Sequence, residues 1–361
     1  MPLADRVLMG PGPSNPYPEV MAALVRPVVG HLDPAFLEVL DETCDRLRQV
    51  FRTANALTLP VSGTGSAGME AAFVNVVEPG DAVVVGVNGL FGERMCDVAA
   101  RCGAEVVRVE AEWGRAIEPE RLLTAHPSPA VIAVVHAETS TGARNDLIGL
   151  GEGKGDALLL VDCVTSLGGI PFDADDWGID LAYSGTQKCL GVPPGLAPLT
   201  VSDRARERLV KRSPSWYLDL AMIGDYVGSA RRYHHTAPVS MVYALHAGLG
   251  VLLDEGLEAS WARHDECGRL LREGLEGLGF RLFAEEGHRL PQLTTVWLPE
   301  GTDDAAVRRT LLDRFGIEVG GGLGPYAGRI WRVGCMGHTA RPRNVALFLA
   351  AVEQARAATT P

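Results

Sequence analysis

The prediction of the fold starts from one stretch, Ser184-Gly-Thr-Gln-Lys188-Cys-Leu-Gly-Val-Pro-Pro-Gly195. It follows a short apolar strand, Asp180-Leu-Ala-Tyr-Ser184, and its glycines and prolines indicate a rigid turn that projects the amine of Lys188. Upstream, Leu158-Leu-Leu-Val-Asp162 predicts a second apolar strand, which ends in a carboxylate. Because ligands bind at the carboxyl ends of parallel strands, we expect Lys188 and Asp162 to lie side by side in a cleft.

Composition and charge exclude several classes of protein. The chain has 361 residues, 47% hydrophobic and 22% charged, which fits a globular protein with one large and one smaller domain. A net charge of −12 gives no reason to expect nucleic acid or an anionic membrane as a partner. The 7 cysteines are scattered without a CxxC pair, which predicts neither a metal site nor disulfides and favours a cytoplasmic protein. We expect no signal peptide and no membrane-spanning run.

Strands and helices alternate along most of the chain. Runs of Val, Leu and Ile separated by helical segments predict an α/β protein with a mostly parallel sheet covered on both faces. Hydrophobic periodicity predicts helices at 34–51, 69–77 and 92–102, and one long helical stretch at 241–276. We divide the chain into an extended, non-helical N-terminal arm rich in Pro and Gly (1–20), a large domain (21–240) and a smaller α+β domain (241–361).

The glycine-rich turn Ser62-Gly-Thr-Gly-Ser-Ala-Gly68 follows one of these strands and opens a helix. Backbone N–H groups at a helix start bind anions, and glycine lets a phosphate approach closely. The turn also satisfies GxGxxG, but the next strand ends near Asn88 without the acidic residue that a dinucleotide site requires. We therefore expect a single phosphate here, although the motif alone supports a purely structural turn about equally well.

Three more positions at strands could contribute chemistry. Phe91 follows a strand and could stack on a flat ring, although core packing is the commoner role of a single Phe. The hydroxyl of Thr139, within His136–Gly142, could bond a cofactor oxygen or cap a turn. Arg332 interrupts an apolar strand, so we expect it to have a carboxylate partner, either from the protein or from a substrate.

The pair formed by Lys188 and Asp162 favours one cofactor. Pyridoxal phosphate requires a Schiff-base lysine and an acid opposite its pyridine nitrogen. The alternative from another enzyme class is a nicotinamide dehydrogenase that uses the Gly63–Gly68 turn. That alternative lacks the expected acid near Asn88 and leaves the Lys188–Asp162 pair unexplained.

Several stretches, taken in order, resemble the class V, or fold-type I, aminotransferases, and in particular the alanine–glyoxylate and serine–glyoxylate group. The stretches are Gly10-Pro-Gly-Pro-Ser-Asn15, Leu159-Leu-Val-Asp162-Cys-Val-Thr-Ser-Leu-Gly-Gly169, Tyr183-Ser-Gly-Thr-Gln-Lys188, Tyr233-His-His-Thr236, and Gly320-Gly-Gly-Leu-Gly-Pro325 with Arg332-Val-Gly334. Each is weak alone, but their common order over nearly the whole chain is specific. The resemblance implies a mostly parallel seven-stranded sheet in the large domain, a smaller C-terminal α+β domain, and pyridoxal 5'-phosphate.

The resemblance also implies roles around the cofactor ring. Lys188 would bind the cofactor as a Schiff base, and Asp162 would pair with the pyridine nitrogen. Val164 would lie under the ring and Phe91 would stack on it, where many relatives carry Trp. Thr139 would lie near the ring oxygen and the substrate.

Other implied roles concern the phosphate, the substrate and a second subunit. The residues that would hold the phosphate from the same chain are Thr64, Gly65, Ser66 and Gln187. Tyr233 and Thr236 would reach the phosphate from the other subunit, which implies a homodimer with shared sites. Arg332 would bind the substrate carboxylate.

The activity implied is the transfer of an amino group from a small amino acid, alanine or serine, to a 2-oxo acid such as glyoxylate or pyruvate. Ser66 stands where alanine–glyoxylate enzymes often have His, and the loop His31–Phe36 partly resembles that of pyridoxamine–pyruvate aminotransferase. These departures leave the substrate open. The alternatives are a specialised aminotransferase with 2-aminoethylphosphonate or pyridoxamine as donor, and a C–S lyase resembling cysteine desulfurases, which would want an exposed cysteine.

Overall fold

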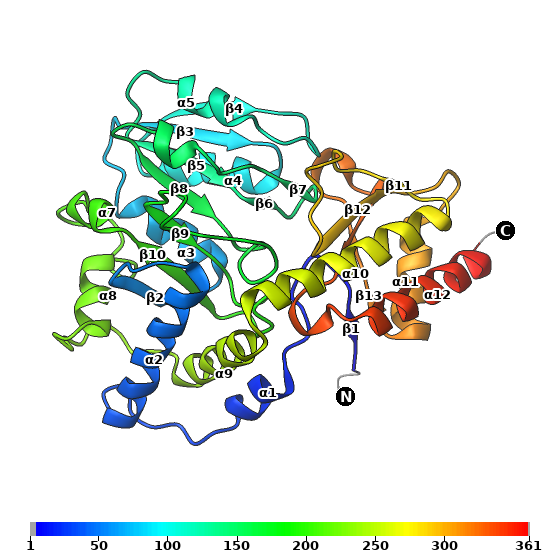
Figure 1. Cartoon of the computed structure of the whole chain (residues 1–361), viewed down its shortest axis with the longest axis horizontal. Coiled ribbons are helices and arrows are strands. Elements are labelled where there is room, and N and C mark those ends of the chain that lie inside the picture. Colours follow the sequence, from blue (N-terminus) through cyan, green and yellow to red (C-terminus); the bar gives the residue numbers. More distant parts are fainter. Residues whose placement is uncertain (1–4, 360–361) are drawn as a thin grey trace.

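The computed structural model describes residues 5–359 and has two parts, each built around its own sheet (Figure 1). The larger part surrounds a seven-stranded sheet, and the smaller part contains a four-stranded antiparallel sheet. This is the α/β fold that the sequence predicts. Residues 1–4 of the predicted N-terminal arm and residues 360–361 of the predicted C-terminal domain lie outside the described residues.

The seven strands of the large sheet follow the order β2-β10-β9-β8-β5-β3-β4. Their bounds are β2 (Leu57–Ser62), β3 (Ala82–Val87), β4 (Glu105–Glu110), β5 (Val131–Val135), β8 (Leu158–Asp162), β9 (Leu181–Tyr183) and β10 (Leu196–Val201). Strand β10 is antiparallel to both of its neighbours, and the other neighbouring pairs are parallel. Strands β8 and β9 are direct neighbours, so the two segments that carry Asp162 and Lys188 leave the sheet side by side, as predicted.

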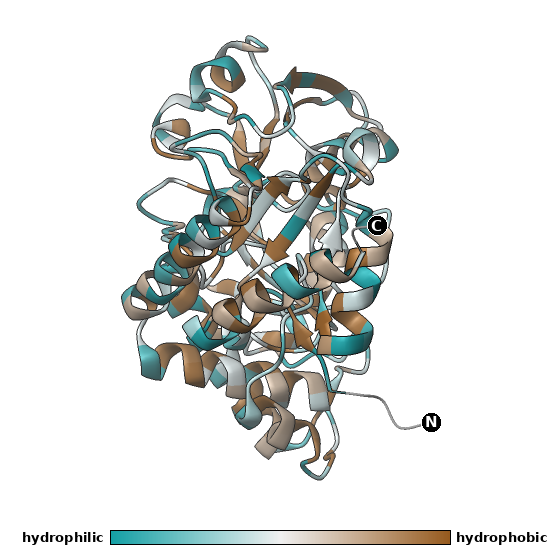
Figure 2. Ribbon diagram, turned by 90° about the vertical axis from the view of Figure 1, so that its right-hand side faces the viewer, coloured by the Kyte–Doolittle hydropathy of each residue, from teal (hydrophilic) through white to brown (hydrophobic). Residues whose placement is uncertain are grey.

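Helices pack on the large sheet and bury its Val- and Leu-rich strands (Figures 1 and 2). The helices of the larger part are α1 (Pro18–Leu24), α2 (Pro34–Phe51), α3 (Gly65–Val74), α4 (Leu90–Arg101), α5 (Pro119–Thr124), α6 (Leu150–Gly153), α7 (Asp203–Glu207), α8 (Leu220–Val227) and α9 (Val239–Glu255), and α1 packs on α9. Helix α2 shows why such a segment folds as it does. Asp33 caps the helix by accepting a hydrogen bond from Ala35 N–H, Pro34 occupies the first turn, and the apolar face with Phe36 and Leu47 is buried.

The smaller part combines the four-stranded sheet, in the order β11-β12-β15-β14, with three long helices. Its elements are α10 (Leu257–Gly277), β11 (Arg281–Leu282), β12 (Leu293–Trp297), α11 (Asp304–Phe315), β13 (Ile317–Glu318), β14 (Gly320–Gly321), η1 (Gly324–Tyr326), β15 (Ile330–Gly334), η2 (Gly337–Thr339) and α12 (Pro342–Thr359). The N-terminal strand β1 (Val7–Leu8) pairs in parallel with β13, so the N-terminal arm crosses to the smaller part. The short hairpin β6 (Ala137–Glu138) and β7 (Ala143–Arg144) follows β5.

The buried apolar side chains form two large clusters. The first fills the larger part and includes the buried residues of α9, which the sequence-based division placed in the C-terminal domain. The second fills the smaller part and includes Met9 of the N-terminal arm. Helix α10 runs from one part to the other (Figure 1). The domain limits that we predict at 20 and 240 therefore do not coincide with the division between the two cores.

The structure corrects three helix predictions. The long stretch at 241–276 is two helices, because Gly256 between them has φ 89°, in the left-handed region that interrupts a helix. The predicted helix at 69–77 begins earlier, at Gly65, so half of the glycine-rich turn is helical. The arm at 1–20 is not free of helix, because α1 begins at Pro18, where proline fits the first turn.

Within residues 5–359, the structure contains no helix that is long and apolar enough to cross a membrane. The same residues contain no group of three or more His, Cys, Asp or Glu side chains arranged to hold a metal ion.

Candidate active site

Lys188 lies in the turn after β9 and is buried by the N-terminal arm. Its Nζ donates a hydrogen bond to the carbonyl of Pro11. The next residue, Gly12, has φ 108°, and a Cβ at that position would lie 2.5 Å from Lys188 Nζ. A side chain at residue 12 would therefore collide with the amine. Glycine is required both for this backbone conformation and for the close approach of the arm.

The environment of Lys188 favours its neutral form. Burial, with a contribution from the nearby Arg332 guanidinium, lowers the pKa of Lys188 to about 8. Lys188 forms no ion pair among the described residues, whereas Lys154 is paired with Asp180 at 2.6 Å. The remaining lysine of the chain, Lys211, is exposed. Lys188 is therefore the lysine best suited to act as a nucleophile and a base near neutral pH.

Asp162 ends β8 and is held by two hydrogen bonds. Its Oδ1 accepts from Val164 N–H at 2.8 Å, and its Oδ2 accepts from the Tyr183 hydroxyl at 2.8 Å. Burial raises the pKa of Asp162 to about 7, and these two hydrogen bonds oppose that rise because they stabilise the carboxylate. Asp162 is thus a buried acid whose position and charge are both set by its neighbours.

Within residues 5–359, the glycine-rich turn leaves backbone amides without hydrogen bonds at the start of α3. Among the described residues, the N–H groups of Gly65 and Ser66 donate no hydrogen bond, and Thr64 caps the helix without a side-chain bond. A Cβ on Gly65 would lie 2.9 Å from Val164 Cγ2, so the turn packs directly against the segment after Asp162. Gln187 Oε1 is buried without a partner among the described residues. Free helix-start amides beside Lys188 and Asp162 fit a phosphorylated pyridine cofactor.

Thr139 and Arg332 meet where the two parts of the molecule touch. Arg332 Nη1 donates to the backbone carbonyl of Thr139 at 3.3 Å, and Nε donates to Gly321 O at 2.8 Å. Within residues 5–359 Arg332 has no ion pair with a carboxylate, although it is only 8% exposed. Burial lowers its pKa to about 10. The protein partner that we considered from the sequence is absent from the described residues, which leaves a buried cation available for an anionic substrate.

Phe91 lies in the first turn of α4, where its backbone N–H donates to Glu138 Oε2 at 3.1 Å. The predicted start of this helix, residue 92, is thus two residues too late. The Phe91 ring is half-buried, and the guanidinium carbon of Arg94 lies 5.0 Å from the ring centroid.

Tyr233 and Thr236 lie apart from these residues within one chain. They belong to a loop before α9, in which Tyr233 is 54% exposed and its hydroxyl is 3.5 Å from Thr236 Oγ1. The neighbouring His235 Nε2 lies 3.3 Å from Ser62 Oγ, so the loop touches the start of the glycine-rich turn. Within residues 5–359, the side chains of Tyr233 and Thr236 form no hydrogen bond with the residues around Lys188.

Sequence reasoning missed Tyr183, Glu138 and Gly12 as parts of this site. Tyr183 stands within the quoted strand but reads as an ordinary core aromatic, because the direction of its hydroxyl depends on pairing between β8 and β9. Glu138 was missed because a glutamate in a sequence is expected to face solvent, whereas in the structure it is 0% exposed. Gly12 was missed because the Pro- and Gly-rich arm predicts a turn but does not show that this turn covers the amine of Lys188.

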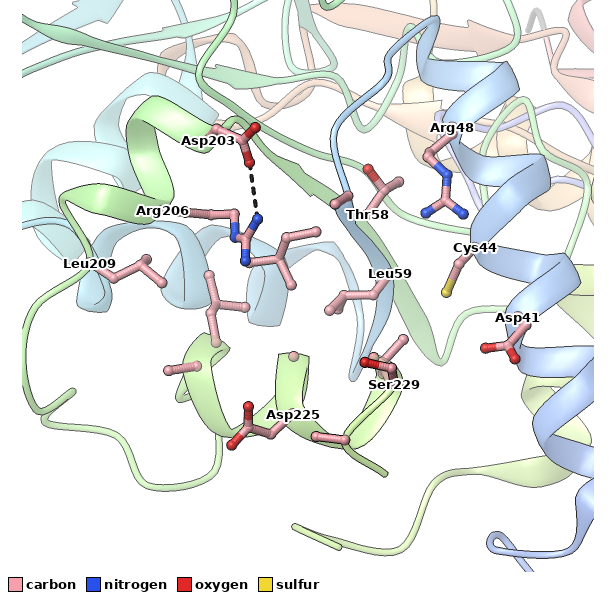
Figure 3. A pocket seen from close by; sticks show the side chains of 18 of the residues that line it. Asp41, Cys44, Arg48, Thr58, Leu59, Asp203, Arg206, Leu209, Asp225 and Ser229 are labelled. Atoms are coloured by element: carbon pink, nitrogen blue, oxygen red, sulfur yellow. Dashed lines mark hydrogen bonds and ion pairs between the residues drawn. The ribbon is translucent and has the colours of Figure 1, made fainter. Parts of the chain in front are cut away.

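A pocket of about 1080 Å³ lies elsewhere, between α2, β2, α7 and α8 (Figure 3). Its lining includes Asp41, Arg48, Thr58 and Asp225, and none of the predicted site residues. The candidate site is therefore defined by the cluster around Lys188 and not by this pocket.

Comparison with known proteins identifies the family of the chain. The profile of the family "Aminotransferase class-V" matches residues 14–328. A crystal structure of alanine–glyoxylate aminotransferase from Nostoc sp. superposes with a TM-score of 0.96 and 50% identity, covering 98% of this chain and 96% of that chain. Alanine–glyoxylate aminotransferase from Callithrix jacchus is 42% identical over 98% of this chain and 88% of its own length. The (S)-ureidoglycine–glyoxylate transaminase from Bacillus subtilis (strain 168) is 39% identical over 96% of this chain and 90% of its own length.

The chain belongs to the class-V aminotransferase family. It has the fold-type I architecture, and it is an aminotransferase that uses pyridoxal 5'-phosphate. The free amides of α3, Lys188 and Asp162 are the groups of this chain that fit the phosphate, the aldehyde and the ring nitrogen of that cofactor. The alternative of a nicotinamide dehydrogenase is therefore excluded.

The hydrogen bond from Tyr183 to Asp162 leads to a first prediction. Tyr183→Phe removes one of the two hydrogen bonds that keep Asp162 ionised, and a hydrogen bond to a charged group contributes about 1.5–3 kcal/mol. We expect the pKa of Asp162 in the cofactor-free protein to rise above 7 by about 1–2 units. Carboxyl ¹³C NMR titration measures this change, with Asp162→Asn identifying the signal.

The same change has a defined effect on stability. Because the folded-state pKa of Asp162 lies above its unfolded value, this group favours folding at acidic pH, and that contribution is lost as pH rises toward 7. In Tyr183→Phe the loss extends to higher pH. An unchanged titration of Asp162 in the variant would contradict the assigned hydrogen bond.

Arg332 leads to a second prediction. Lysine cannot reproduce the planar fork that binds a carboxylate with two hydrogen bonds. We expect Arg332→Lys to lower kcat/KM for the amino acid and the oxo acid by about 2–4 kcal/mol of transition-state binding, with cofactor affinity little changed. Steady-state kinetics with both substrates check this.

Arg308→Lys is a matched control for Arg332→Lys, because Arg308 forms a two-bond ion pair with Asp304 in the smaller part. This control should lower the melting temperature slightly and leave the kinetics unchanged. Normal kinetics in Arg332→Lys, together with a lowered melting temperature, would show that Arg332 is purely structural.

Proposed function

We propose that this aminotransferase transfers the amino group of a small amino acid to glyoxylate. The observation that carries the proposal is the buried Arg332, which has backbone partners and no carboxylate partner in residues 5–359. It lies close enough to Lys188 to influence the lysine's pKa, so a substrate carboxylate bound to Arg332 would bring Cα near the amine. All three similar proteins described above carry glyoxylate in their names, which supports it as the acceptor. Alanine and serine are the proposed donors.

In this proposal the residues of the chain have distinct tasks. Pyridoxal phosphate supplies an electron-withdrawing ring that makes the substrate Cα–H acidic. Lys188 Nζ, whose pKa burial lowers to about 8, would in its neutral form take the proton from the substrate Cα and deliver it to C4′ of the cofactor, and the reverse half of the cycle would run this transfer backwards. Asp162, as a carboxylate, keeps the ring nitrogen protonated. Arg332 orients the substrate by its carboxylate, and the N-terminal arm at Pro11 and Gly12 excludes water from Lys188.

The phosphate is proposed to bind at the start of α3. Gly65 and Ser66 would donate their free N–H groups, and the side chains of Thr64, Ser66 and Gln187 would complete the site. Val164 and Phe91 would enclose the ring from two sides. This phosphate site supports a phosphorylated cofactor and argues against pyridoxamine, which has no phosphate, as the main donor.

The C–S lyase alternative finds less support. Such an enzyme needs a reactive, accessible cysteine. Of the seven free cysteines, six are buried and Cys102 is partly exposed at the end of α4. Burial raises the pKa of Cys189, next to Lys188, to about 12, which disfavours the thiolate. Activity assays with alanine, serine, (S)-ureidoglycine, 2-aminoethylphosphonate, pyridoxamine and cysteine as donors, against glyoxylate and pyruvate, test the proposal. A preference for a donor other than alanine or serine, or for pyruvate over glyoxylate, would overturn it.

We also propose a homodimer in which each site is completed by the other chain. Tyr233 is exposed in the single chain, on a loop that touches Ser62 through His235. The loop follows another exposed aromatic pair, Trp216 and Tyr217, and exposed aromatic side chains are typical of interfaces. This arrangement supports Tyr233 and Thr236 as ligands of the partner's phosphate.

Lys188 gives a third prediction. Lys188→Ala should abolish transamination and the absorbance band that arises from covalent attachment of the cofactor, because no other lysine lies in the site. Absorbance spectra and single-turnover assays measure both losses. Lys211→Ala, which changes an exposed lysine, is the control and should retain both. Retention of either property by Lys188→Ala would show that another group binds the cofactor.

A fourth prediction concerns the dimer. Alone, Lys188→Ala chains should be inactive and Tyr233→Ala chains weakly active, because each lacks one necessary part of every site. After the two are mixed and allowed to exchange, each heterodimer gains one intact site, so activity should rise to about one quarter of wild type. Sedimentation establishes the oligomeric state. Full activity in a demonstrated monomer, or no complementation despite heterodimer formation, would contradict the shared site.

A further inference from the structure

Helix α4 begins without a cap of its own. Its N-cap residue is Gly89, which has no side chain to bond the first N–H groups of the helix. The cap comes instead from the hairpin after β5. Leu90 N–H donates to Ser140 Oγ at 2.9 Å, while Phe91 N–H and Gly92 N–H donate to Glu138 Oε2 at 3.1 and 3.3 Å. Three consecutive amides of the first turn are thus bonded by residues distant in sequence.

Glu138 and Ser140 also hold each other. Glu138 Oε1 accepts from Ser140 N–H at 3.0 Å and from the Ser140 hydroxyl at 2.6 Å. The hydroxyl therefore donates to Glu138 and accepts from Leu90, which fixes its orientation. A Cβ on Gly89 would lie 2.4 Å from Glu138 Cδ and from Ser140 Oγ. The pair occupies the space that a local capping side chain would need.

A buried carboxylate is an unusual choice for a helix cap in this protein. Asp33, Asp219 and Asp303 cap α2, α8 and α11 with side chains that belong to the helix N-terminus itself and are accessible to water. Glu138 is fully buried and forms no ion pair in residues 5–359, and burial raises its pKa while its hydrogen bonds oppose the rise. Holding a buried carboxylate costs more free energy than an exposed cap needs. Its position therefore calls for a role beyond helix stability.

The role is indicated by what the capped turn carries. Phe91 is the second residue of α4, and its own amide is bonded to Glu138. Thr139, between Glu138 and Ser140, gives its carbonyl to Arg332. The three residues 138–140 thus fix the proposed ring-stacking side chain on one side and the proposed substrate-binding guanidinium on the other.

We infer that Glu138 and Ser140 are positioning residues that hold the first turn of α4 so that the Phe91 ring is set against the cofactor. The inference rests on the proposed roles of Phe91 and Lys188. Neither residue needs to touch the cofactor, because the effect passes through the backbone of Leu90 and Phe91.

A double-mutant cycle tests whether Ser140 acts through Phe91. The variants are Ser140→Ala, Phe91→Leu and the double variant, each measured for pyridoxal phosphate affinity by titration of the cofactor-free full-length protein. We expect Ser140→Ala to weaken binding by about fivefold, the usual size of a lost cap. Phe91→Leu should weaken binding at least as much, and the double variant should be no weaker than Phe91→Leu alone.

Asp303→Ala is the matched control. It removes the bond that caps Ala306 N–H at 2.9 Å on α11, so it should lower the melting temperature and leave cofactor affinity unchanged. If Ser140→Ala folds poorly, Glu138→Gln takes its place in the double-mutant cycle, because glutamine keeps the size of the side chain. Ser140→Thr keeps a hydroxyl and should restore most of the affinity.

The outcomes are distinct. Unchanged affinity in Ser140→Ala and Glu138→Gln, or losses that add in the double variants, would overturn the inference while leaving the proposed function intact. Unchanged affinity in Phe91→Leu would overturn it by removing the ring-stacking role. Failure of the wild-type protein to bind pyridoxal phosphate or transaminate would instead reject the proposed function, and the inference with it.

Discussion

The burial of ionisable groups that form no ion pair within residues 5–359 is the constraint on which this structure depends. Lys188 is a buried amine and Arg332 is a buried cation, and they donate to the backbone carbonyls of Pro11, Gly321 and Thr139. Asp162 is a buried carboxylate held by an amide and a hydroxyl. Burial lowers the pKa of Lys188 and raises that of Asp162, so both approach neutral pH, where a proton-transferring site is most useful. Such a site is stable only if several distant segments supply hydrogen bonds together.

Those segments explain the connection between the two parts of the molecule. The N-terminal arm runs along the smaller part, where Met9 N–H donates to Glu318 O at 2.9 Å, and then covers Lys188 with Gly12. The hairpin after β5 connects the two parts in the opposite direction. It leaves the large sheet and meets the small one, where Thr295 Oγ1 donates to Thr141 O at 2.6 Å. The active site is therefore built at the junction, and both parts must be in place for Arg332 to face Lys188.

Much of the fold and part of the candidate site could be predicted from local sequence. Apolar runs that end at Asp162 or precede Lys188 predict strands, and the helix at Pro34–Phe51 follows from its periodicity and from proline after Asp33. The break at Gly256 was missed because apolar residues recur on both sides of it. The cap on α4 was missed because it joins residues about fifty positions apart, and no sequence pattern near Gly89 indicates such a cap.

Local sequence is enough to predict the α/β class, the strand ends that present Lys188 and Asp162, and the glycine-rich turn, because each depends on residues close together in the chain. The folded structure is needed to show that, within residues 5–359, Gln187 Oε1 has no hydrogen-bond partner and the Arg332 guanidinium bonds to backbone carbonyls but to no carboxylate. These environments arise because β8, β9, the hairpin and β15 come together. The sequence names these side chains, but the desolvation and hydrogen bonds that set their charge arise from packing between distant segments.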